Sequence, residues 1–177
     1  MWYVYIIRSI NPTDDFMRLL LEDIRRKGFK KLGFILAEDP YLTSFVESFE
    51  KLKNTDESIE VFYKTTDAEN DFRTSITQLK DAKFDAIGVM LFPGQVSTFY
   101  RQLNAAGITV PTFGTDIFHS KQEISDARGA MKGAFYPIPE VPANFIEKYR
   151  AKFNSDTHVS FAYNSYVFGE ILSKIKD

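Results

Sequence analysis

Three short loops of the sequence hold the side chains best suited to contact a ligand. Each loop follows an apolar run that is typical of a buried β-strand, and ligands of open parallel sheets bind outside the carboxyl ends of the strands. Two of the acids also have a structural interpretation, Asp39 as a helix cap and Asp116 as a turn or cap residue. The candidate ligand-binding residues are Asp39 and Tyr41 (with Glu38 beside them), Phe92 and Pro93, and Thr115 and Asp116.

Signals for catalysis or for a metal site are weak. The sequence has neither a Gly-x-Ser-x-Gly nucleophile elbow nor a Gly-x-x-x-x-Gly-Lys phosphate loop, and its only histidines, His119 and His158, are far apart. The absence of cysteine excludes disulfides and cysteine-based metal sites. We therefore predict a protein that is not an enzyme and that has no cofactor or metal.

The charge distribution argues against nucleic acid as a partner. The net charge is -2, and lysine and arginine are scattered along the 177 residues, whereas phosphate binding needs a concentrated basic face. No run is long and apolar enough to cross a membrane. The first eight residues lack the features of a signal peptide and instead predict a strand that starts abruptly.

Strands and helices alternate through the first two thirds of the chain. This alternation predicts parallel βαβ units with helices on both faces, that is, a three-layer αβα sheet of the Rossmann-like α/β class. Helices are predicted from apolar residues at helical spacing, for example Phe16, Leu19, Leu20 and Ile24 before Gly28. The predicted strands are 3–7, 32–37, 59–63, 86–91 and 109–113, with the order 2-1-3-4-5.

The pattern changes after Asp116. Ser120 and Glu123 have the spacing of a capping box, which predicts a short helix that ends near Gly129. A sixth strand at 133–136 and an extended segment with Pro137, Pro139 and Pro142 follow. Two final helices are predicted at 143–153 and 161–176.

A degenerate receiver domain of response regulators is one alternative interpretation, because Glu38 and Asp39 follow a strand and a Pro-Gly turn comes later. That family needs a phosphoacceptor aspartate where Met90, Leu91 and Phe92 stand. It also needs a lysine after its fifth strand, where this chain continues with Gly114, Thr115 and Asp116. A cytoplasmic doubly wound domain of this kind remains the second alternative.

Several segments, in order and spacing, resemble the type I periplasmic binding proteins, specifically the family that binds branched-chain amino acids (Leu, Ile, Val) for ABC transporters. The resemblance covers nearly the whole chain, although no single motif in it is diagnostic. The segments that carry it are Ile7-Arg8-Ser9, 30–35 with Asp39-Pro40-Tyr41, 71–80, Phe84-Asp85-Ala86-Ile87, Arg101-Gln102-Leu103, Ala106-Gly107, 110–114, 145–153 and Ala162-Tyr163-Asn164-Ser165.

The resemblance implies roles for three sites of contact. Tyr41 matches a tyrosine that helps to close over the ligand, and Asp116 matches a glutamate that pairs with the ligand's α-ammonium group. Aspartate is one methylene shorter, which puts the reach in doubt, and the Phe92-Pro93 turn replaces a tyrosine. The partners that this implies are a small amino-acid-like ligand and, through the intact parent protein, the membrane permease of an ABC transporter.

The resemblance also implies a fragment. Residues 1–132 match the second lobe of a two-lobed protein, and 133–177 match the crossing segment and helices that return to the first lobe. The parent would be periplasmic or extracellular, with an export signal upstream of Met1, and a ligand-sensing domain of a membrane receptor is the first alternative function. Because the tail keeps apolar faces, we also expect a homodimer through residues 137–177.

Overall fold

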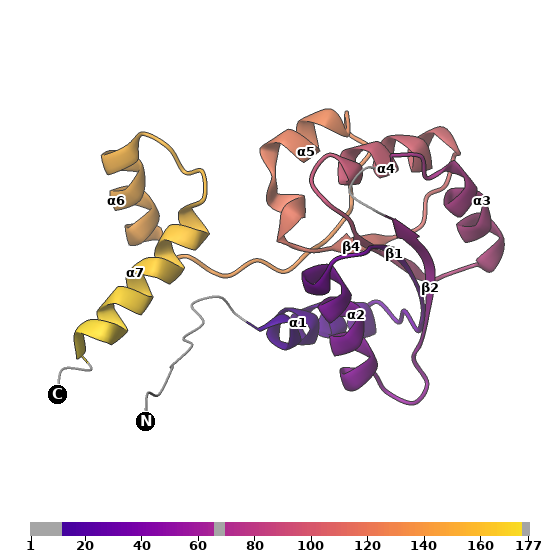
Figure 1. Cartoon of the computed structure of the whole chain (residues 1–177), viewed down its shortest axis with the longest axis horizontal. Helices are drawn as coiled ribbons and strands as arrows, with labels where there is room; N and C mark the ends of the chain where they lie inside the picture. The colour runs from indigo at the N-terminus through magenta and orange to yellow at the C-terminus, as the bar shows by residue number, and fades with distance from the viewer. Residues whose placement is uncertain (1–11, 66–69, 175–177) are drawn as a thin grey trace, which may run out of the picture. The chain divides into compact units, whose positions relative to one another are not determined.

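The computed structural model describes residues 12–65 and 70–174, which fall into two compact units. The larger unit is Thr13–Pro137, and the smaller one includes the chain from Ile138 onward. The larger unit holds every strand of the described sheet and all three candidate loops (Figure 1).

The larger unit is built on a sheet of four parallel strands. These are β1 (Lys31–Ala37), β2 (Ser58–Thr65), β3 (Ala86–Met90) and β4 (Thr112–Gly114), in the order β2-β1-β3-β4. Residues 32–36 of β1 pair in parallel with 86–90 of β3. The predicted parallel α/β class is therefore confirmed.

The predicted order of the strands is wrong. It separated 32–37 from 59–63 by the strand 3–7, whereas β1 pairs directly with β2 on one side and with β3 on the other. The predicted strand 3–7 itself lies outside the described residues. The last strand also starts at Thr112 rather than at Thr109. Pro111 has no N–H to give to the ladder, so only its carbonyl takes part, accepting from the Ile87 amide at 2.9 Å.

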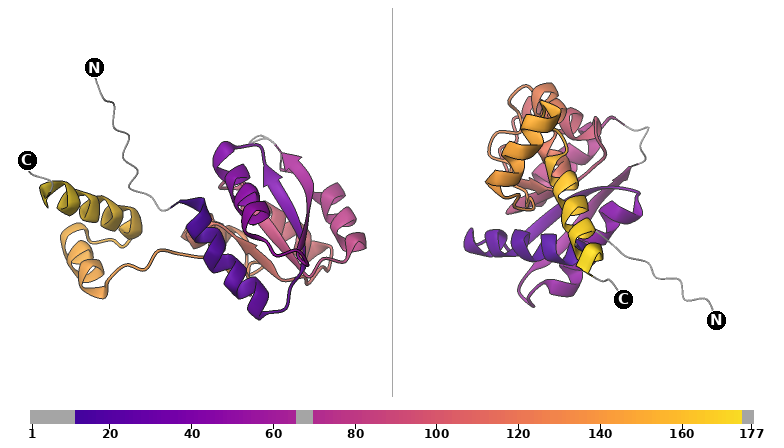
Figure 2. Two further views of the ribbon diagram at one scale, coloured as in Figure 1. Left: turned by 90° about the horizontal axis from the view of Figure 1, so that it is seen from below. Right: turned by 90° about the vertical axis from the view of Figure 1, so that its left-hand side faces the viewer.

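Helices cover both faces of this sheet (Figures 1 and 2). The helices α1 (Thr13–Arg26) and α2 (Pro40–Leu52) pack together on one face, and α3 (Arg73–Ala82), α4 (Gln95–Ala105) and α5 (Lys121–Asp126) lie on the other. Phenylalanine dominates the core. The ring of Phe34 in β1 lies 5.9 Å from that of Phe49 in α2 and 5.5 Å from that of Phe113 in β4.

The buried face of α1 differs in part from the predicted one. Leu19 is 54% exposed, whereas Met17 and Leu21, which the spacing did not select, are buried. Phe16, Leu20 and Ile24 are buried as predicted.

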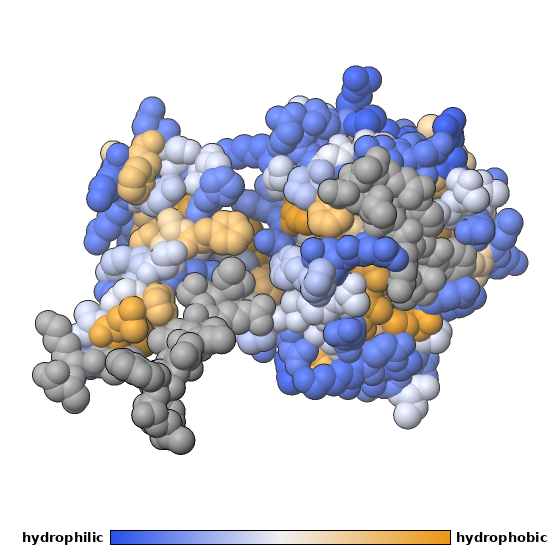
Figure 3. Space-filling model, viewed as in Figure 1, coloured by the Kyte–Doolittle hydropathy of each residue, from blue (hydrophilic) through white to orange (hydrophobic). Residues whose placement is uncertain are grey.

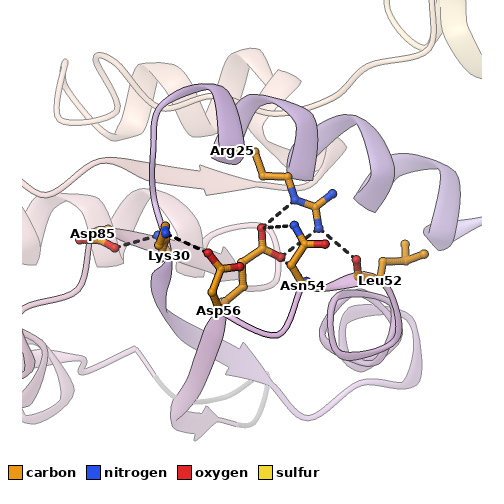
Figure 4. A network of polar contacts seen from close by, with 7 residues as sticks. Arg25, Lys30, Leu52, Asn54, Asp56 and Asp85 are labelled. Atoms are coloured by element: carbon orange, nitrogen blue, oxygen red, sulfur yellow. Dashed lines mark hydrogen bonds and ion pairs between the residues drawn. The ribbon is translucent and has the colours of Figure 1, made fainter.

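A polar network ties the ends of α1 and α2 to the start of the sheet (Figure 4). Arg25 of α1 donates to the Glu57 carboxylate from Nε (2.7 Å) and Nη2 (2.9 Å), and Nη2 also donates to the Leu52 carbonyl at 3.0 Å. The Asp85 carboxylate accepts from the backbone amides of Lys30 and Lys31 at 2.8 and 2.7 Å. These contacts lie where β1 begins, at the opposite edge of the sheet from the candidate loops.

The segment after β4 departs from the prediction in two places. A 3₁₀ turn, η1 (Asp116–His119), comes first, and α5 then ends at Asp126, before the predicted end near Gly129. The predicted sixth strand is a single parallel bridge in which the Phe135 amide donates to the Thr112 carbonyl and the Gly114 amide donates to the Phe135 carbonyl, each at 3.1 Å.

The smaller unit is a helical hairpin of α6 (Ala143–Phe153) and α7 (Val159–Lys174). The Phe145 ring lies 5.1 Å from that of Tyr163 and 5.4 Å from that of Tyr166, and the Tyr149 hydroxyl donates to the Thr157 carbonyl at 3.1 Å. No described residue of α6 or α7 is buried, and apolar side chains reach the surface (Figure 3). The large exposed ones are Phe153, Phe161, Tyr166, Ile171 and Leu172.

Candidate functional site

The three candidate loops follow the carboxyl ends of β1, β3 and β4, which are parallel neighbours and therefore end at one edge of the sheet. Two of the predicted residues are in direct contact there. The Tyr41 hydroxyl donates to Oδ1 of Asp116 at 3.2 Å, across 75 residues of sequence. Among the described residues, the Asp116 carboxylate has no other hydrogen-bond partner.

Tyr41 is held from its own helix. Its ring meets the buried Phe45 ring edge-on at a centroid distance of 5.2 Å, and its carbonyl accepts from the Ser44 hydroxyl at 2.6 Å. The residue as a whole is 38% exposed. The tyrosine hydroxyl thus lies at the surface while the ring is anchored, which suits a residue that orients a neighbouring carboxylate.

Asp39 acts as the N-cap of α2. Its backbone is extended (φ -142°, ψ 137°), and its carboxylate accepts from the amides of Tyr41 (2.8 Å) and Leu42 (3.2 Å). Asp39 also lines a surface hollow of about 440 Å³ together with Glu38, Thr43 and Glu47, but this hollow does not include Tyr41 or Asp116. The structural interpretation of Asp39 therefore holds, and its contact with a ligand remains a prediction.

Thr115 is likewise a cap. It is 1% exposed, and its hydroxyl accepts from the Ile117 amide at 3.3 Å, which starts η1 and sets the position of Asp116. Direct contact between Thr115 and a ligand remains a prediction that this burial does not favour. The backbone of the β4–η1 loop is thus fixed before any ligand arrives.

The β3–α4 loop is held from two sides. The Gln95 side chain is buried and accepts from the Phe92 amide at 3.2 Å. The buried Glu123 carboxylate of α5 accepts from the amides of Gly94 and, at 2.8 Å, Ser97. Phe92 is half-buried and Pro93 is exposed on this fixed loop.

The position of Glu123 corrects the capping-box prediction. The Ser120 hydroxyl accepts from the Glu123 amide at 3.4 Å, as predicted, but the Glu123 carboxylate turns to α4 instead of returning to the amide of Ser120. Sequence reasoning missed this contact because the Ser-x-x-Glu pattern already provides a local partner.

The described residues hold neither a candidate metal site nor a candidate membrane span. Among residues 12–65 and 70–174, no three His, Cys, Asp or Glu side chains gather in a way that could hold a metal ion. Across the same ranges, no helix has both the length and the apolar character that a membrane span requires. His119 lies on η1, where its Nδ1 is 3.2 Å from the Tyr136 hydroxyl, and His158 is in the smaller unit.

Comparison with solved structures identifies the fold. A protein from Rhodospirillum rubrum described as a branched-chain amino acid ABC transporter matches with a TM-score of 0.77 and 18% identity, over 95% of this chain and 51% of that one. An extracellular ligand-binding receptor from Rhodopseudomonas palustris matches with a TM-score of 0.71 and 17% identity, over 90% and 49% of the two chains.

A third match includes a bound ligand. The branched-chain amino acid transporter substrate-binding protein of Streptococcus pneumoniae, in complex with isoleucine, has a TM-score of 0.63 and 20% identity, over 89% of this chain and 47% of that one. The chain thus spans about half the length of these proteins. No family model matches the sequence, and no curated protein matches it either.

These likenesses show that the chain has the fold of one lobe of type I periplasmic binding proteins. Identities of 20% or less do not transfer a ligand or an activity. What the site binds must be argued from its own residues.

Proposed function

We propose that this chain is one lobe of a non-catalytic solute-binding protein that binds a small amino-acid-like ligand at the carboxyl edge of its sheet. In the intact protein, a second lobe would close over the ligand by hinge motion. The protein would act outside the cytoplasmic membrane and deliver its ligand to the permease of an ABC transporter. The observation that carries the proposal is the Tyr41–Asp116 pair at this edge.

The pair suits the ammonium group of an amino acid. A carboxylate that accepts one hydrogen bond from a tyrosine keeps lone pairs for a cationic donor, and such charge-assisted bonds are short and strong. The three loops, 37–41, 91–97 and 113–120, contain Glu38, Asp39 and Asp116 but neither lysine nor arginine. The local field therefore favours a cation.

The experiment is calorimetry on the full-length protein with leucine, isoleucine and valine, followed by the same titrations on Asp116→Ala. Loss of one charge-assisted contact is worth about 1.5–3 kcal/mol, so the Kd should rise about 10- to 150-fold. Glu47→Ala is the matched control, because it removes a carboxylate from the neighbouring hollow and not from the pair. An unchanged Kd for Asp116→Ala would remove Asp116 from the site.

Ligand sensing by a membrane receptor is the second candidate, and the match to an extracellular ligand-binding receptor favours it. The same site would serve both functions, so a binding assay does not separate them. Co-purification with a permease would favour transport, whereas a ligand-dependent signalling output would favour sensing.

Self-association is a further part of the proposal. The exposed apolar side chains of α6 and α7 would pack on a second copy of the chain, since such surfaces are usually covered. Light scattering at micromolar concentration should give a dimer that truncation after Pro137 abolishes. A monomer with ordered α6 and α7 would contradict it.

A further inference from the structure

The N-terminal amides of α4 already donate hydrogen bonds to groups of the protein itself. Helix N-termini attract anions because their first amides have no partner within the helix and lie at the positive end of the dipole. In α4 the amides of Gly94 and Ser97 donate to the Glu123 carboxylate, and those of Gln95 and Val96 donate to the Phe92 carbonyl at 3.1 and 3.3 Å. No amide of the first turn is left for a ligand.

The N-terminus of α2, at the same edge of the sheet, is filled in the same way. Pro40 has no N–H, the amides of Tyr41 and Leu42 donate to the Asp39 carboxylate, and the Thr43 amide donates to the Asp39 carbonyl at 2.8 Å. Both helices that begin at this edge, α2 and α4, thus carry a protein carboxylate on their first amides.

We infer that Glu123 is a positioning residue that determines the charge specificity of this edge. It occupies the anion position of α4, so a ligand's carboxylate or phosphate finds no donor there, while Asp116 remains available for an ammonium group. An amino acid would then contact this lobe with its ammonium end. The inference deepens the proposed function and rests on it for the identity of the site.

Glu123 differs from Asp39 in where it comes from. Asp39 is an ordinary local cap, one residue before its helix, whereas Glu123 reaches α4 from α5, 26–29 residues later in the chain. Glu123 is 3% exposed. Removal of its carboxylate would therefore leave a vacant, buried anion position at the N-terminus of α4.

The test uses inorganic phosphate as the probe and needs no natural ligand. In a ¹⁵N–¹H NMR titration of the wild-type chain, the Gly94 and Ser97 amide signals should show no saturable shift. In Glu123→Ala the same two signals should shift saturably. Saturable shifts in the wild type would overturn the inference.

Thermal unfolding gives a second readout. Glu123→Ala should lose roughly 5–10 °C in Tm. Phosphate should restore roughly 3–6 °C of this at a concentration tenfold above its Kd, relative to chloride at equal ionic strength. Asp126→Ala is the control, since the carboxylate that it removes accepts from Gln122 of the same helix, and the backbone carbonyl that accepts from Arg101 of α4 is retained; phosphate should not raise its Tm.

Two further arms keep the test decisive. If Glu123→Ala does not fold, Glu123→Ser also removes the charge and vacates the position, and it should show the same phosphate response; a folded variant without that response would overturn the role of Glu123. If the full-length protein binds no amino acid, the proposed function fails, but the phosphate result still decides whether Glu123 excludes anions.

Discussion

Substitution of Glu57 should strongly lower the stability of the larger unit. Its side chain is 4% exposed, and it receives hydrogen bonds from Arg25 at 2.7 and 2.9 Å and from the Asn54 amide at 2.6 Å. Glu57→Ala removes the acceptor of this amide and of two Arg25 hydrogen bonds, and leaves the guanidinium only its bond to the Leu52 carbonyl. Breaking a buried pair costs about 3–5 kcal/mol, and Arg25 is 37% exposed, so we expect a loss of about 2–3 kcal/mol.

A double-mutant cycle isolates the pair. Arg25→Met keeps the apolar stem and removes the charge, so the coupling energy with Glu57→Ala should be about 1–2 kcal/mol in urea denaturation. The neighbouring Lys30–Asp56 pair is the control, because it is exposed on both sides (64% and 59%) and its removal should change stability little.

The same pair predicts a pH dependence. The Arg25 guanidinium lowers the pKa of the Glu57 carboxyl below its ordinary value of 4.5, so the folded state binds the proton less tightly than the unfolded state. The resulting stabilisation is full above the unfolded pKa and is lost as the pH falls through the lower folded pKa. The stability difference between wild type and Glu57→Gln should therefore be constant from pH 7 to about 5 and shrink below that. A coupling energy near zero, or a difference that does not shrink as the pH falls below 4.5, would refute the reasoning.

Two further substitutions probe the core beside the site. Tyr100→Phe removes a buried hydroxyl that donates to the Thr112 hydroxyl at 2.7 Å, and the unpaired threonine should cost about 1–2 kcal/mol in denaturation, whereas a neutral result would mean that water replaces the bond. Gly88→Ala would place a Cβ 2.5 Å from the Phe34 ring, so overpacking should lower stability by about 1–3 kcal/mol; an unchanged Tm would show that the ring can move.

The sequence predicted well those helices and strands whose ends are marked by nearby residues. The helix predicted at 143–153 coincides with α6, because its apolar spacing starts directly after Pro142, and the apolar run at 86–91 coincides with β3 to within one residue. The pairing of strands was less accessible, because apolar periodicity says which residues are buried and not which strand is the neighbour.

The errors have identifiable causes. Leu19, Leu20 and Leu21 are consecutive leucines, so residue type alone does not tell which of them faces the solvent. Packing of α1 against α2 buries Leu20 and Leu21 and leaves Leu19 exposed. The partner of Glu123 lies 26–29 residues away, beyond the reach of any local motif. At the site, the strand ends placed Tyr41 and Asp116 at one edge, but the hydrogen bond between them needed the three-dimensional structure.

The bridge at Phe135 affects how the sheet can pair with other molecules. A β-strand at the margin of a sheet is a template on which another molecule can add its own strand and start aggregation. Here the backbone of Phe135 already occupies the free side of β4, and β4 itself has only three residues. The turn that returns the chain to Phe135 therefore blocks this side of the sheet from pairing with strands of other molecules.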